Sequence, residues 1–226
     1  MNSAKKNQST YLTIGIIGAI LTMIGDVLLM GVSSYGATDI FDKFNLLASK
    51  LSYIRIGLAG AFGTIGIPMC AVGLYVLYLT LPDQKSRLAS VYRNTIIGSF
   101  GTLGGCVHVI CCYLMTGLKM NVEAGDKTPL MTSLRQQAGF AIPVLAVFFI
   151  LYIINSISMA LLIGKGKTIL PRWMWILNPL LLRYMINWTG LVFNSAFMNG
   201  LCCTNMSLGA LIILCAWGIV IAKKDS

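Results

Sequence analysis

Long apolar runs, separated by short polar and charged segments, make up most of this sequence. A helix needs about 20 apolar residues to cross a hydrocarbon core of roughly 30 Å. The pattern therefore predicts about six membrane-spanning helices, near residues 11–32, 54–81, 91–118, 137–163, 173–193 and 201–222. The fifth run is the least regular, because Asn178-Pro179 and Arg183 interrupt it. The predicted fold is all-α, a polytopic transmembrane helix bundle that forms one domain over residues 1–226.

Two connecting segments have patterns of their own. Apolar residues recur at spacings of three and four from Phe41 to Ile54, among charged residues. This spacing predicts a short amphipathic helix at the membrane interface. The segment 119–135 is polar, and we expect it to be the longest loop.

Composition supports a membrane protein and argues against a water-soluble one. Hydrophobic residues make up 57% of the chain and charged residues 11%, whereas about a quarter of the residues in an average soluble domain are charged. The net charge of +10 could suggest nucleic acid, but the basic residues are scattered and form no single stripe with interleaved aromatics. We therefore expect membrane lipids as partners, and no nucleic acid.

The distribution of Lys and Arg predicts that both termini are cytoplasmic. With this topology ten basic residues lie inside and six outside, and the positive-inside rule favours that orientation. The inner ten are Lys5, Lys6, Lys85, Arg87, Arg93, Lys165, Lys167, Arg172, Lys223 and Lys224, and the outer six are Lys43, Lys50, Arg55, Lys119, Lys127 and Arg135. The predicted location is the cell membrane, as a multi-pass protein.

Small residues form stripes at helical spacing within the predicted spans. One stripe comprises Gly15, Gly18, Thr22 and Asp26, and another comprises Gly98, Gly101, Gly105, His108 and Cys112. Such stripes are typical of tight helix packing in membranes, which is the ordinary interpretation. These two stripes also carry an ionisable residue, which packing alone does not explain.

Ionisable residues within spans are costly and by default indicate a functional site. The three candidates are Asp26, His108 and Arg183, and a rise of 1.5 Å per residue places all three roughly 15 to 23 Å from the cytoplasmic edge. Asn187 follows Arg183 by one turn, and Asn194 comes nearer the outer end. We predict that these five residues bind a ligand in a polar chamber reached from the extracytoplasmic side.

The roles of the charged candidates stay open at this point. Asp26 and Arg183 could neutralise one another in a salt bridge. His108 could then hold a proton, bind a substrate group or satisfy a backbone carbonyl. The catalytic residues, if there are any, are unknown, and His108 and Asp26 are the candidates.

Neither a cofactor nor a metal is predicted. His108 is the single histidine, which excludes a multi-histidine metal centre, and the soluble catalytic motifs are absent. The adjacent pairs Cys111-Cys112 and Cys202-Cys203 lack the CxxC spacing of zinc and redox motifs, so they are interpreted as small packing residues. A disulfide between the two pairs remains an alternative.

Three short motifs resemble an uncharacterised family of small bacterial multi-span integral-membrane proteins. They are Gly25-Asp26-Val27-Leu28-Leu29, His108 and Phe197-Met198-Asn199-Gly200. Because this family has no established activity, the resemblance implies a location in the bacterial inner membrane and no particular function.

Three functions fit the pattern. The first is binding or transport of a small polar or amphipathic ligand in an intramembrane pocket open to the extracytoplasmic side. The second is an intramembrane enzyme acting on a lipid or isoprenoid, with His108 as acid or base and Asp26 orienting it. The third is a structural or accessory membrane subunit. We favour the first, because the polar residues gather at one depth without a second acid or a metal ligand. Whether the protein is an enzyme, and which oligomer it forms, are left open.

Overall fold

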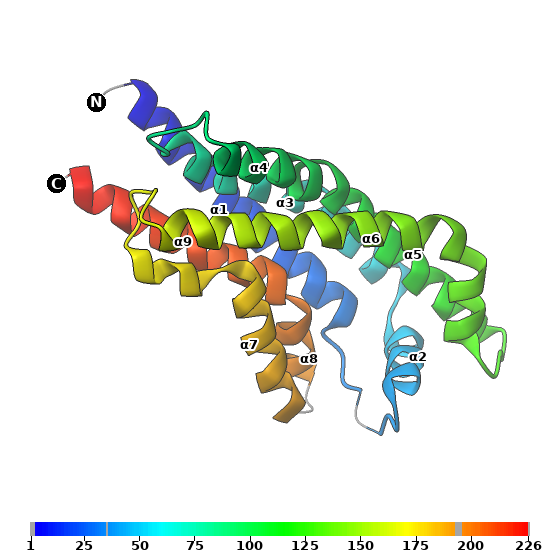
Figure 1. Ribbon diagram of the computed structural model, residues 1–226. Coiled ribbons are helices and arrows are strands. Elements are labelled where there is room, and N and C mark those ends of the chain that lie inside the picture. Colours follow the sequence, from blue (N-terminus) through cyan, green and yellow to red (C-terminus); the bar gives the residue numbers. More distant parts are fainter. Residues whose placement is uncertain (1–2, 35, 193–195, 226) are drawn as a thin grey trace.

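The computed structural model describes residues 3–34, 36–192 and 196–225, and within these ranges all regular elements are helices (Figure 1). In chain order they are α1 (Ser3–Met30), α2 (Ile40–Lys50), α3 (Tyr53–Leu79), α4 (Arg87–Ile96), the π-helix η1 (Ile97–Leu103), α5 (Gly104–Glu123), α6 (Pro129–Gly164), the 3-10 helix η2 (Arg172–Leu177), α7 (Pro179–Val192), α8 (Ala196–Cys203) and α9 (Asn205–Asp225). The predicted all-α fold class is confirmed.

Five of the described helical segments are long and apolar enough to cross a membrane. They are Asn7–Met30, Tyr53–Leu79, Arg87–Glu123, Pro129–Gly164 and Asn205–Lys223. Large apolar side chains remain exposed along them; Ile150 and Ile157 of α6, for example, are 57% and 51% exposed. A water-soluble monomer rarely leaves so much apolar surface uncovered. The chain is therefore a polytopic helix bundle of the membrane type.

The predicted fifth span, near 173–193, is not one continuous helix. It is divided between η2 and α7, and α7 has only 14 residues, fewer than the roughly 20 that a span needs. The break lies at Asn178, which is extended because the following Pro179 disfavours helical geometry there. The amide of Asn178 donates to the carbonyl oxygen of Ser156 in α6 at 2.6 Å, which fixes the bend. The count of six spans therefore stays a prediction.

The polar segment 119–135, which we expected to be the longest loop, is mostly helical. α5 continues to Glu123 and α6 begins at Pro129, so only a short turn separates them. Gly125 makes this turn with a positive φ of 78°. The predicted amphipathic helix is confirmed: α2 spans Ile40–Lys50 and buries Leu47 and Ala48.

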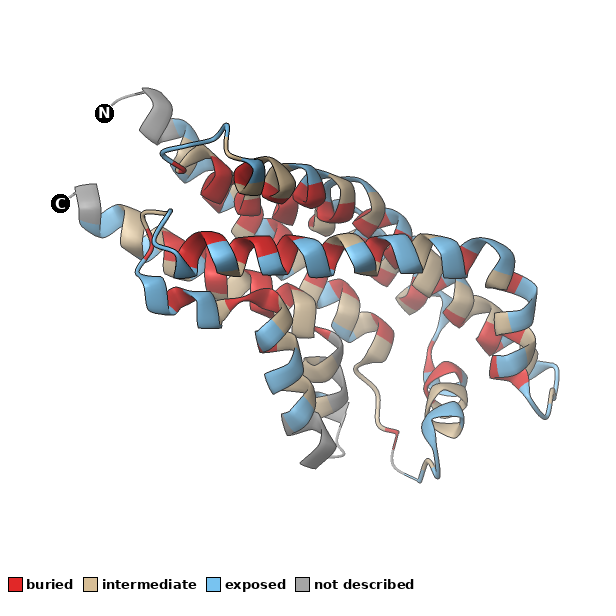
Figure 2. Cartoon of the chain, viewed as in Figure 1, coloured by how far each residue is buried: buried red, intermediate tan, exposed pale blue. Residues whose placement is uncertain are grey.

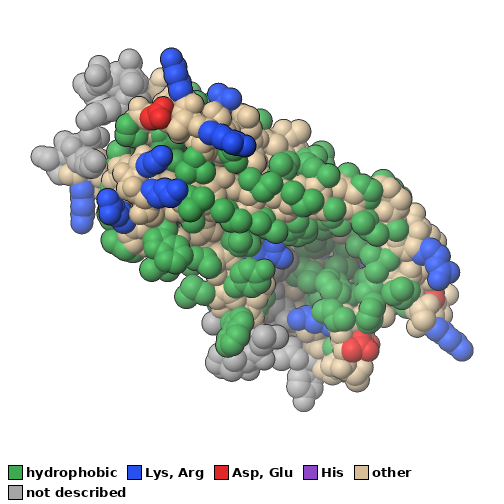
Figure 3. Space-filling model, viewed as in Figure 1, with side chains coloured by type: hydrophobic (Ala, Val, Ile, Leu, Met, Phe, Trp, Pro, Cys, Tyr) green, Lys and Arg blue, Asp and Glu red, His purple; other side chains and the backbone are tan. Residues whose placement is uncertain are grey.

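The two ends of the bundle carry different charges. The start of α1 and the end of α9 lie at one end, together with the α3–α4 turn and the α6–η2 connection (Figure 1). In the space-filling view, Lys and Arg side chains gather at this end beside an acidic side chain, and basic and acidic side chains are mixed at the other end (Figure 3). Which end faces the cytoplasm stays a prediction.

Close contact between α1 and α3 depends on glycine. Gly15 and Gly73 face each other so closely that a Cβ atom on Gly15 would overlap the Cα atom of Gly73. Gly18 and Gly66 meet in the same way one turn further along. The stripe of small residues predicted for the first span is thus a packing surface, as expected where no hydrophobic effect drives helices together.

Buried residues run along the inward faces of the long helices and form two apolar clusters (Figure 2). The larger cluster, nearer the termini, contains Tyr92, Tyr152 and Trp217. The smaller one, toward the other end, contains Leu51 and Leu118. The polar residues described next lie between these two clusters.

Candidate functional site

A cavity of about 270 Å³ lies between six helical elements of the bundle. Its walls are formed by Thr22 and Asp26 of α1, Ile67 and Cys70 of α3, Phe100 of η1, Gly104, Val107, His108 and Cys111 of α5, Leu145, Phe148 and Phe149 of α6, and Met206 and Ser207 of α9. Most of these side chains are apolar. Figure 3 shows the surface hollowed beneath α6, with mainly hydrophobic side chains around the hollow and Lys or Arg side chains at its edge.

His108 has distinct surroundings at its two ring nitrogens. Nε2 lies 3.0 Å from the carbonyl oxygen of Ala59 in α3, and because a carbonyl only accepts, this nitrogen carries the donated proton. Nδ1 faces Oδ1 of Asp26 at 3.8 Å. In the neutral ring Nδ1 has a lone pair, and at this distance the two side chains are close neighbours without a direct hydrogen bond.

Glycines make room for the histidine ring. A Cβ atom on Gly63 of α3 would overlap the imidazole, and one on Gly25 of α1 would lie 3.4 Å from Nε2. The ring of His108 is therefore clamped between α1 and α3, and it is 6% exposed. This close fit fixes the direction of Nδ1 toward Asp26.

Asp26 lies near the end of α1 and has a second partner. Its Oδ2 accepts a hydrogen bond from the hydroxyl of Ser207 in α9 at 2.8 Å. One carboxyl group thus connects three helices, through His108 on α5 and Ser207 on α9. The structure brings Asp26 and His108 together, as the depth argument predicted.

Arg183 does not pair with Asp26. Its Nη1 lies 3.8 Å from the sulfur of Met206, and the guanidinium carbon is 5.1 Å from the centre of the Phe149 ring. Within the described residues no ion pair joins Arg183 to a carboxylate. Because Phe149 and Met206 both line the cavity, Arg183 is placed at its border.

The two asparagines predicted for the site have different outcomes. Asn187, one turn after Arg183 on α7, accepts a hydrogen bond from the amide of Asn205 at 2.9 Å. It therefore joins α7 to the start of α9 and is not among the cavity residues. Asn194 lies outside the residues that the structure describes.

The model of a family of unknown function (DUF6796) matches residues 1–224. The chain belongs to this family. No curated protein and no solved structure matches it. The predicted membership of an uncharacterised family is confirmed, while the bacterial origin stays a prediction.

In this member of DUF6796 we find no group of three or more His, Cys, Asp and Glu side chains, among the described residues, that could hold a metal ion. The expectation of no metal and no cofactor stays a prediction. Within the described residues, Cys70, Cys106, Cys111, Cys112 and Cys215 form no disulfide. Cys111 faces the cavity, whereas its neighbour Cys112 belongs to the smaller apolar cluster.

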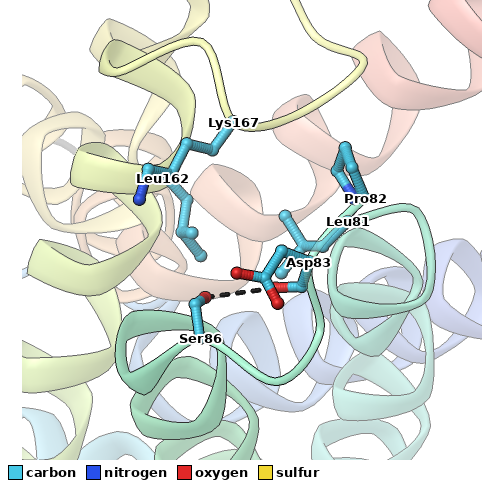
Figure 4. Close-up of a pocket in the computed structure, with 6 residues that line it drawn as sticks. All are labelled: Leu81, Pro82, Asp83, Ser86, Leu162 and Lys167. Atoms are coloured by element: carbon cyan, nitrogen blue, oxygen red, sulfur yellow. Dashed lines mark hydrogen bonds between the residues drawn. The ribbon is translucent and has the colours of Figure 1, made fainter.

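A second hollow, of about 180 Å³, lies at the end of the bundle where both termini are found (Figure 4). The side chains of Asp83 and Ser86, which line it, already have local partners. The Ser86 hydroxyl donates to the backbone carbonyl of Asp83 and accepts from the amide of Ala89, and the Asp83 carboxylate accepts from the amide of Lys85. These bonds begin α4, so we interpret them as helix capping.

Sequence reasoning missed two cavity residues of α9, Met206 and Ser207. Three hydrogen-bonding residues, Thr204, Asn205 and Ser207, precede the apolar run of α9. This cluster was the available signal. It was not decisive, because the sequence does not give the register of α9 against α1.

Proposed function

We propose that this protein binds a small amphipathic molecule within the membrane, in the cavity between α1, α3, α5, α6 and α9. One observation carries the proposal: Asp26, His108 and Ser207 bring polar atoms to a cavity whose other walls are largely apolar. A few convergent polar groups in an otherwise apolar pocket are typical of small-molecule sites.

The size of the cavity supports a ligand larger than water. Its volume of about 270 Å³ is close to the lower limit of ordinary ligand pockets, which measure roughly 300–1,000 Å³. The apolar side chains, such as Leu145 and Phe148, suit a hydrocarbon group. The polar groups suit a head group with hydrogen-bonding atoms. Binding of this kind is also the step that a transporter requires.

The test is whether an amphiphile stays with the purified protein. The protein would be reconstituted with a total membrane lipid extract, purified in mild detergent and examined by native mass spectrometry. Leu145→Trp places a large ring in the cavity, whereas Val147→Trp adds the same ring on the same helix at a side chain that is 49% exposed. We expect a bound small molecule in the parent and in Val147→Trp, and its loss in Leu145→Trp.

The control decides how the result is interpreted. If both tryptophan variants retain the same molecule in equal amounts, it binds elsewhere and the proposal is wrong. If the parent carries no molecule beyond the bulk lipids found on both variants, the cavity is empty under conditions that should fill it. That result would also contradict the proposal.

Intramembrane catalysis is a second candidate, favoured by the contact between His108 and Asp26. A histidine that lies beside a carboxyl group at a cavity can serve as a general acid or base. In that case Asp26→Asn and His108→Asn should retain the co-purified molecule and accumulate it unchanged. Recovery of the same mixture of molecules from the parent and from both variants would remove this candidate.

A further inference from the structure

We infer that the ligand of this cavity is an anionic amphiphile, whose carboxylate or phosphate group binds Arg183 while its hydrocarbon part occupies the apolar walls. The inference rests on the proposed function and specifies the class of ligand. It follows from the surroundings of the Arg183 side chain.

Arg183 has more hydrogen-bonding capacity than its neighbours use. A guanidinium group has five N–H donors and no acceptor. Its contacts are the sulfur of Met206 at 3.8 Å, which is a weak acceptor, and the face of the Phe149 ring at 5.1 Å. In the part of the chain that the structure describes, no carboxylate lies within ion-pair distance of it.

The position of Arg183 on α7 makes its charge costly unless a ligand complements it. The outward side chains Tyr184, Met185 and Trp188 are 60%, 59% and 75% exposed, so this face of α7 presents an apolar surface of the kind that faces lipid. Arg183, on the same helix, is half-buried. A charge at such a depth normally has a partner of opposite sign or marks the path of a ligand.

The nearest carboxyl group of the cavity is already engaged. Asp26 accepts from Ser207 of α9 and faces His108 of α5, and neither contact is with α7. Arg183 contacts Met206, the residue that precedes Ser207, so the anion and the cation meet consecutive residues of α9 without meeting each other. The anion that complements Arg183 is therefore expected to come from a bound molecule.

Carboxylate and phosphate groups match the planar guanidinium, which binds them through two parallel hydrogen bonds. The aromatic ring of Phe149 and the thioether of Met206 belong to both the cavity wall and the surroundings of Arg183. A molecule with its head group at Arg183 would thus have its hydrocarbon part against these two side chains. Both parts of an anionic amphiphile have a matching surface.

Occupancy can be followed through the thiol of Cys111, which lines the cavity. The other six of the seven cysteines would be replaced by alanine, and the protein placed in nanodiscs. The rate of alkylation by N-ethylmaleimide would then be measured with increasing dodecyl phosphate, dodecanoate, dodecanol or dodecylamine. These probes share one tail and differ in head group. A chain with Cys215 alone, which is exposed on α9, is the control for effects on the bilayer.

We expect the two anions to protect Cys111 at a concentration at least about tenfold lower than dodecanol, a difference equivalent to about 1.4 kcal/mol. Dodecylamine should protect least, and none of the probes should protect Cys215. The relative potency of dodecanoate and dodecyl phosphate identifies the preferred anion. Arg183→Gln should remove the advantage of the anions, and Arg183→Lys should keep part of it.

Equal protection by dodecanol and by both anions in the parent would overturn the inference, and this comparison needs no variant that could misfold. So would an advantage of the anions that survives in a folded Arg183→Gln protein. In both cases the cavity still binds an amphiphile and the proposed function stands. If no probe protects Cys111 at all, the inference and the proposed function fail together.

Discussion

His108 lies so close to Gly63 that a Cβ atom at position 63 would overlap the imidazole ring. Ala59, whose carbonyl oxygen accepts the hydrogen bond from Nε2 of His108, lies one turn earlier than Gly63 on the same helix, α3. Two features of α3 thus set the orientation of the histidine: an acceptor that fixes one nitrogen and a gap that admits the ring. Nδ1 is left facing Asp26 as a consequence.

Gly63→Ala should therefore displace His108 and weaken the bundle. The added methyl group forces the ring to move in a tightly packed place, and overpacking of this kind costs about 1–3 kcal/mol. We expect a lower unfolding temperature in detergent, together with a changed alkylation rate at Cys111 as the cavity wall shifts.

Gly57→Ala is the matched control, because it lies on the same helix and a Cβ atom there meets nothing within 4 Å. It should cost nothing, or stabilise α3 by up to about 1 kcal/mol, since alanine favours helix over glycine. Equal effects of the two substitutions would show that His108 does not depend on the gap at Gly63.

Gly15→Val should destabilise the protein more strongly. Its Cβ atom would overlap backbone atoms of Gly73, which cannot move aside as a flexible side chain can. We expect a loss of about 3 kcal/mol or failure to assemble, measured by unfolding in detergent. Gly218→Val on α9, where a Cβ atom meets nothing within 4 Å, should remain close to the parent. A stable, monodisperse Gly15→Val protein would contradict the close contact between α1 and α3.

Arg55 is a basic residue whose role the sequence did not indicate. Its side chain donates to the carbonyl oxygens of Val27, Leu28 and Gly31, at 3.0, 2.5 and 3.1 Å, and so caps the end of α1. A cation is favourable at a helix C-terminus, where the last carbonyls lack the usual bonds from the next turn. Of these three carbonyls, that of Val27 also accepts from the backbone amide of Gly31 at 2.7 Å.

Arg55→Met should accordingly destabilise the protein by about 2 kcal/mol, in the range for hydrogen bonds to charged groups. Because Asp26 directly precedes the capped segment, the end of α1 that carries it should also become more accessible to hydrogen exchange. Lys127→Met, which removes an exposed cation from the α5–α6 turn, serves as the comparison. Hydrogen exchange in residues 26–31 that matches the parent would exclude this role for Arg55.

Much of the fold could be predicted because apolar run length directly reflects the thickness of a membrane. The failures have local causes that run length does not record. Asn178 binds a carbonyl of α6, which turns the chain away after η2 and leaves α7 short. The polar segment after Lys119 looked like a loop, but Lys119 pairs with Glu123 four residues later, a spacing that supports a helix.

The candidate site was predictable in part for a similar reason. Depth along a helix follows from residue number, so Asp26 and His108 could be placed at one level. Which partner each residue selects depends on how the helices are rotated about their axes. Rotation directs Asp26 to Ser207 and Arg183 to Met206, and the sequence does not contain this information in a form that periodicity can extract.

The orientation of the bundle gives the last prediction. The α3–α4 turn and the α5–α6 turn lie at opposite ends of the molecule (Figure 1). If the basic end is cytoplasmic, as the positive-inside rule predicts, a membrane-impermeant maleimide added to intact cells should label Lys127→Cys and not Gln84→Cys. Both positions are exposed, and both substitutions would be made in a chain without its native cysteines. After the cells are opened, both should react. Labelling of Gln84→Cys alone in intact cells would show the inverted topology. Asp26 lies only four residues before the end of α1 that faces away from the termini. The inverted topology would therefore place the cavity nearer the cytoplasmic side.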